Sequence, residues 1–115
     1  MTRNKKKGYV YLVSTWDSPD LYKIGVTRGD IKKRIKKLQT GNPSELRTVK
    51  YHETDYPFFL EKQLHFRFRV RHLYGEWFNL TIAEALSFDQ VCNQIEQMIE
   101  GMKDNEFFMK NLKCQ

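Results

Sequence analysis

The sequence has 115 residues, 40% of them hydrophobic, and a formal net charge of +6 at pH 7. This length and composition predict one domain, residues 1–115, with a single buried core. The apolar runs are too short to cross a bilayer, and the first residues, MTRNKKKG, lack the apolar stretch of a secretory signal. We therefore expect an intracellular, cytoplasmic protein without a membrane partner.

Cysteine spacing and charge distribution narrow the function. Cys92 and Cys114 lie far from each other and from any histidine at metal-binding spacing, so we expect reduced structural thiols rather than a disulfide or a zinc site. Residues 1–50 hold 13 basic and 4 acidic side chains, whereas residues 81–115 hold 3 and 6. A positive N-terminal half suits nucleic acid, and a solvated face that keeps the protein soluble is the alternative.

The first predicted element is a β-hairpin. Residues 8–14 and 21–26 are rich in β-branched and aromatic side chains, and the intervening TWDSPD has turn chemistry. Because side chains alternate across a strand, Lys23 and Gly25 point away from the apolar side chains of the second strand. A lysine in such a strand calls for a more particular explanation.

A basic helix is predicted after the hairpin, with Asp30 as its N-cap and Gly41 near its end. Arg34 lies beside the apolar stripe, which consists of Ile31, Ile35 and Leu38. The basic side chains on and before this helix are the predicted nucleic-acid contacts, namely Arg28, Lys32, Lys33, Lys36 and Lys37.

Three elements follow the basic helix. Residues 44–54 predict a third strand, and Pro57 suits the first turn of a second helix within residues 55–72. Glu61 and His65 lie one turn apart on that helix and face the same way. After Gly75, residues 76–80 (EWFNL) predict a short strand. Its aromatic residues, Trp77 and Phe78, are expected in the core, although an exposed ring could stack on a base.

The C-terminal part predicts helices. Thr81 with Glu84 and Ser87 with Gln90 fit the capping box. An apolar stripe then recurs at helical spacing, at Phe88, Val91, Ile95, Met98 and Met102. We expect this stripe to pack on the domain's own core, and a homodimer seam is the alternative. Residues 107–112 are expected to continue the packing.

The element order β-β-α-β-α-β-α predicts an α+β fold, in which helices flank a small, mostly antiparallel β-sheet.

Five pieces of the sequence resemble the motifs of the GIY-YIG nuclease superfamily in order and approximate spacing. They are VYL at 10–12, KIG at 23–25, Arg34, Glu61 in LEKQLHFRF and Asn79 in EWFNL. The whole set is similar to the phage and viral branch, whose second motif usually reads KIG. The resemblance covers residues 8–80, which implies a nuclease core there and a C-terminal helical extension at residues 81–115. It implies a GIY-YIG-like fold and an endonuclease or nickase that hydrolyses phosphodiester bonds in DNA. It also implies Mg²⁺ or Mn²⁺ as cofactor and the cytoplasm of an infected host cell as location.

The resemblance also implies roles for single residues. Lys23 takes the tyrosine position of the second motif, and Glu61 matches the metal-binding acid. The other matched positions are Tyr11 for the first-motif tyrosine, Gly25 for the second-motif glycine, Arg34 for the helix arginine and Asn79 for the late asparagine. His65 is either a partner of the metal ligand or a structural histidine.

The chemistry of the reaction gives these residues compatible roles. Arg34 can brace the phosphate, and Glu61 can anchor a hard divalent cation. Tyr11 is a poor base at its ordinary pKa of about 10, so we expect Lys23 to lie close and favour its phenolate, with a phosphate contact as the alternative role of Lys23. A catalytically weak or inactive nucleic-acid-binding or interaction module on the same scaffold is the alternative function.

Overall fold

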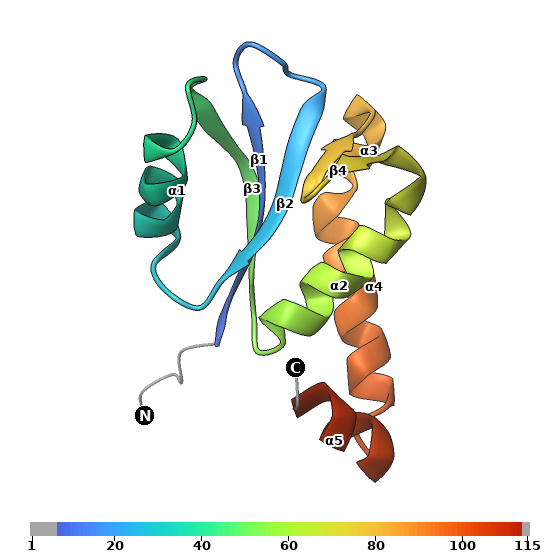
Figure 1. Cartoon of the computed structure of the whole chain (residues 1–115). Helices are drawn as coiled ribbons and strands as arrows, with labels where there is room; N and C mark the ends of the chain where they lie inside the picture. The colour runs from blue at the N-terminus through green and yellow to red at the C-terminus, as the bar shows by residue number, and fades with distance from the viewer. Residues whose placement is uncertain (1–6, 114–115) are drawn as a thin grey trace.

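Five strands and five helices make up the part of the chain that the structure, a computed structural model, describes, residues 7–113 (Figure 1). The strands are β1 (Gly8–Thr15), β2 (Leu21–Thr27), β3 (Leu46–Thr54), β4 (His72–Tyr74) and β5 (Trp77–Asn79). They form one antiparallel sheet in the order β3-β1-β2-β5-β4. The helices are α1 (Ile31–Thr40), α2 (Pro57–Arg67), α3 (Ile82–Leu86), α4 (Phe88–Gly101) and α5 (Glu106–Lys113). The predicted α+β class is confirmed.

The register of the β1–β2 hairpin decides which side chains share a face. Tyr11 lies opposite Gly25 and Val13 lies opposite Lys23, so Tyr11, Gly25 and Lys23 are on the same face of the sheet. We call this the open face, because α1 stands beside it whereas α2 and α4 cover the other side (Figure 1). The covered face carries the core, which includes Val10, Leu12, Tyr22, Ile24, Leu60, Leu64, Phe78 and Phe88.

Helix α1 begins as predicted and packs more loosely than predicted. Asp30 Oδ1 accepts hydrogen bonds from the backbone N–H groups of Lys32, at 2.7 Å, and Lys33, at 3.2 Å. None of its residues is fully buried, and the stripe of Ile31, Ile35 and Leu38 is only half-buried. A cavity of about 480 Å³ between α1 and β3 explains the difference, because two of the stripe residues, Ile31 and Ile35, line it.

The second helix is shorter than residues 55–72. It ends at Arg67, a 3-10 turn spans Arg69–Arg71, and His72 opens β4, which residue patterns did not reveal. β4 and β5 form a hairpin around Gly75, whose φ of 52° is in the left-handed region that favours glycine. The expected strand at residues 76–80 is therefore one half of a hairpin.

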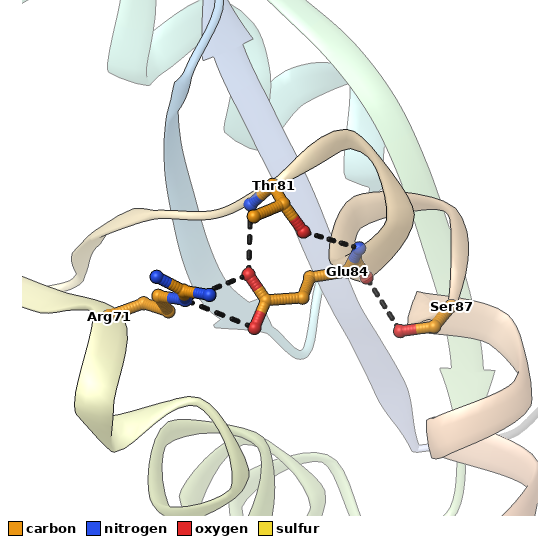
Figure 2. Close-up of polar contacts among 4 residues, drawn as sticks. All are labelled: Arg71, Thr81, Glu84 and Ser87. Atoms are coloured by element: carbon orange, nitrogen blue, oxygen red, sulfur yellow. Dashed lines mark hydrogen bonds and ion pairs between the residues drawn. The ribbon is translucent and has the colours of Figure 1, made fainter.

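Thr81 and Glu84 form the predicted capping box (Figure 2). Thr81 Oγ1 accepts the backbone N–H of Glu84 at 3.1 Å, and Glu84 Oε1 accepts the backbone N–H of Thr81 at 2.9 Å. Arg71 fixes the same carboxylate through its Nε, 3.1 Å from Oε1. The second box is wrong, because Ser87 Oγ donates to the Glu84 carbonyl at 2.7 Å and makes no cap of its own.

The apolar stripe of α4 packs mainly on the domain's own core. Phe88 and Val91 are buried and Ile95 packs against the core, whereas Met98 is 44% exposed. Ile99 is buried in its place, at 1% exposure. The homodimer through this region stays a prediction, as does the division at residue 80. Cys92 is buried and free, as expected, and Cys114 lies outside the described residues. Within residues 7–113 no helix could span a bilayer.

Candidate active site

Tyr11 is completely buried in the middle of β1 and lies across Gly25 of β2. A Cβ atom at position 25 would overlap the Tyr11 ring, including its hydroxyl oxygen. Glycine is therefore required here by close approach, and it lets the phenol lie flat on the neighbouring strand. The KIG sequence thus sets the position of the Tyr11 hydroxyl.

Replacing Gly25 by alanine is expected to destabilise the protein by about 1–3 kcal/mol, because the added methyl group displaces the buried Tyr11 ring. Gly101→Ala is the matched control, since a Cβ at that position of α4 meets nothing within 4 Å. The control is expected to be neutral or slightly stabilising. Thermal and urea unfolding measure both, and equal stability of the two variants would contradict the close approach.

Arg34 of α1 reaches the Tyr11 hydroxyl. Its Nε–H donates a hydrogen bond to Tyr11 Oη at 3.3 Å. Burial raises the pKa of Tyr11 above its usual value of 10.0, and the Arg34 guanidinium opposes this shift. Burial is the larger effect, so Tyr11 is a neutral phenol near pH 7 and acts as a hydrogen-bonding group. Its phenol oxygen also fixes the direction of the Arg34 fork.

Lys23 forms an ion pair with Glu76. Lys23 Nζ lies 3.3 Å from Glu76 Oε1 and 5.7 Å from the centroid of the Trp77 ring. Its charge opposes the rise in the pKa of Glu61 that burial and the Glu76 carboxylate cause. The role of Lys23 in favouring the Tyr11 phenolate stays a prediction, and burial, which raises the pKa of Tyr11, acts against it. The electrostatic effect of Lys23 is on the carboxylates.

Glu61 comes from α2, which lies against β2 beyond the end of β5. In the described chain, β5 pairs with β2 only from Leu21 to Lys23, so α2 can approach the rest of that edge. The pKa of Glu61 is raised to about 7. Burial is the main cause, and the neighbouring Glu76 carboxylate adds to it. Glu61 Oε2 is buried and has no hydrogen-bond partner among the described residues. We call Glu61 and Glu76 the carboxylate pair.

The carboxylate pair fits a hard divalent cation. Two adjacent carboxylates repel each other, and a buried oxygen without a partner is costly, so a cation would relieve both effects. No group of three or more His, Cys, Asp or Glu side chains suited to a metal occurs among residues 7–113. With only two carboxylates as protein ligands, water and phosphate oxygens would have to complete the coordination of a divalent cation here.

Comparison with known families agrees with a nuclease-like module. The sequence profile of the T5orf172 domain matches residues 8–103. The chain belongs to the T5orf172 domain family. This phage-associated domain is related to nuclease-like folds of the GIY-YIG kind, which fits a module that interacts with DNA. No curated protein and no solved structure matches the chain.

In this T5orf172 domain, His65 fastens α2 to the sheet. His65 Nε2 lies 2.9 Å from the backbone carbonyl oxygen of Ile24, so that nitrogen carries a proton and donates. The imidazole also meets the Phe78 ring edge to face, with centroids 4.9 Å apart. These contacts favour the structural alternative for His65, which holds Glu61 in place through the helix.

In the described part of the chain, Asn79 and the basic residues predicted to bind nucleic acid take no part in the contacts around the carboxylate pair. Asn79 is the last residue of β5, two residues after Trp77. It pairs with Leu21 of β2 and is exposed. Within residues 7–113, no hydrogen bond or ion pair joins Asn79 to the carboxylate pair. Four lysines of α1 are exposed, namely Lys32, Lys33, Lys36 and Lys37. Arg28 stacks over the Phe58 ring at 4.8 Å.

Glu76 is the site residue of this T5orf172 domain that sequence patterns missed. It lies in the turn between β4 and β5, directly before Trp77. The only sequence signal for Glu76 was its place directly before β5, the strand that pairs with β2 at Lys23. Because β4 was not predicted, neither the hairpin turn nor the place of its carboxylate could be derived.

Proposed function

We propose that this T5orf172 domain is a GIY-YIG-type endonuclease or nickase that hydrolyses phosphodiester bonds in DNA with Mg²⁺ or Mn²⁺. The observation that carries the proposal is the carboxylate pair, in which Glu61 Oε2 is buried without a partner and Glu76 lies beside it. Cationic side chains adjoin the same place, because Lys23 pairs with Glu76 and Arg34 bonds Tyr11.

A divalent cation held by Glu61 and Glu76 would supply Lewis-acid stabilisation of the phosphate and a bound water of lowered pKa. The chain's own residues provide the rest of the site. Arg34 uses Nε for Tyr11, which leaves both terminal nitrogens of its fork for phosphate oxygens. Lys23 adds a second positive charge, which helps to neutralise charge that develops on the non-bridging oxygens.

Tyr11 is proposed to act as a positioning hydrogen-bond partner rather than as the base. Its oxygen accepts the Arg34 bond and so fixes the direction of the Arg34 guanidinium. Because burial keeps the phenol neutral, this role needs no phenolate. Asn79 and the lysines of α1 are proposed to bind the DNA backbone away from the carboxylate pair.

The alternative function is a catalytically weak or inactive nucleic-acid-binding module. The exposed lysines of α1 favour this reading, since backbone binding needs only positive charge. Binding that weakens steeply with salt and is not followed by cleavage is the result expected for such a module.

Supercoiled plasmid DNA distinguishes the two. With Mg²⁺ or Mn²⁺ we expect relaxed or linear product, and with chelator we expect the rate to fall by at least about 100-fold. Cleavage products separated on a gel measure this, and a monomer would give nicked circles whereas a homodimer through the C-terminal helices would give linear DNA. Equal cleavage with chelator would contradict the metal site, and binding without cleavage in either metal would leave only the module.

A further inference from the structure

The β4–β5 hairpin places two aromatic side chains on the open face beside the carboxylate pair. Tyr74 pairs with Trp77 across the hairpin, and Trp77 pairs with Lys23 of β2. Directly paired residues point to the same side of a sheet, so both rings share the face of Lys23. Tyr74 is 63% exposed and Trp77 is half-buried, and neither belongs to the buried core.

These rings line a cavity of about 160 Å³ together with Leu21 of β2. Its polar lining comes from two loops and includes Ser18, Asn42 and Ser44. Asn42 Oδ1 accepts the backbone N–H of Ser44 at 3.0 Å, which leaves the amide NH₂ as a donor. Two aromatic walls with hydroxyl and amide groups at the rim suit one planar, polar heterocycle.

We propose that this cavity, the base pocket, binds an unpaired nucleobase of the strand that is cut. The inference rests on the proposed nuclease function, because binding of a DNA phosphate at Lys23 would bring the neighbouring base to Trp77. Leu21 and Lys23 lie two residues apart on β2, about 7 Å, which a single nucleotide can bridge. Bases of any sequence stack on aromatic side chains.

The base pocket has a consequence for substrate class. In an intact duplex every base is stacked and paired, and taking one out costs a few kcal/mol. DNA that already has unpaired bases avoids this cost, so single-stranded, gapped or branched DNA is the preferred substrate. Lys23 Nζ lies 5.7 Å from the centroid of the Trp77 ring, and its positive charge favours a nucleic acid strand over an apolar side chain of a protein partner.

Fluorescence of 2-aminopurine tests the base pocket without cleavage. In a Glu61→Gln background, a short single-stranded oligonucleotide carrying this base is expected to bind with quenching, because the base stacks. Tyr74→Ala, or Tyr74→Leu, which keeps apolar bulk in the strand, is expected to bind about 5- to 100-fold more weakly and with less quenching. Tyr74→Phe keeps a stacking ring and is expected to restore both, and Phe107→Ala on α5, 77% exposed, is the matched control.

Each outcome separates the base pocket from the nuclease proposal. Unchanged quenching in Tyr74→Ala and Tyr74→Leu, or equal affinity for single strands and duplex, overturns the base pocket even if the parent protein cleaves DNA with Mg²⁺. If quenching depends on Tyr74 and the parent protein, with Glu61 intact, cleaves nothing with either metal, the result supports the base pocket and overturns the nuclease proposal.

Discussion

Glu61→Gln is expected to lower metal-dependent cleavage of plasmid DNA by about 100- to 1000-fold while DNA binding is kept. The amide has nearly the shape of the carboxylate, so α2 and its His65 contact with β2 are preserved. It lacks the negative charge that would hold a cation beside Glu76. The loss should therefore appear in the cleavage rate rather than in affinity for DNA.

A matched control for this variant is Glu100→Gln. Glu100 is exposed on α4 and pairs with Lys103 one turn away, remote from the carboxylate pair in sequence. Its removal is expected to leave cleavage unchanged, because an exposed pair contributes little. Gel assays of initial rates and fluorescence anisotropy of labelled DNA give the two quantities. If Glu61→Gln cleaved at the parental rate in Mg²⁺, the proposed metal site would be wrong.

Local sequence rules sufficed for most of the architecture. The β1–β2 hairpin, the Asp30 cap of α1 and the Thr81 capping box each depend on a few adjacent residues, and all three were predicted. The α2–β4 region was not, because β4 has only three residues and follows a helix of similar aromatic and basic composition. Too short a run lacks the period that distinguishes a strand from a helix.

The candidate site was predictable as a set of residues and not as a set of contacts. Motif order nominated Tyr11, Arg34 and Glu61, and the Tyr11–Arg34 hydrogen bond joins two of them. The partner of Lys23 could not be derived, because it depends on the turn that brings Glu76 beside β2. The burial that keeps Tyr11 neutral is likewise a tertiary property, set by the ring's position over Gly25.

Stability should fall as pH rises through the range in which Glu61 ionises. Its carboxyl pKa is 4.5 when unperturbed and about 7 in the folded protein. Between these values the folded state binds more protons than the unfolded state, so the free energy of unfolding decreases with rising pH. The loss is complete above pH 7 and is about 1–3 kcal/mol once partial exposure to solvent is allowed for.

Glu61→Gln removes this cost, since an amide does not ionise. In chelator at pH 8 the variant is expected to be more stable than the parent by about 1–3 kcal/mol, and at pH 4.5 the two should be alike. Mg²⁺ at pH 8 should stabilise the parent by mass action and leave the variant unchanged. Urea unfolding at several pH values measures these differences. If the stability of the parent did not change between pH 4.5 and 8, the Glu61 carboxylate would not destabilise the fold. If Mg²⁺ stabilised the variant as much as the parent, the carboxylate pair would not be the metal site.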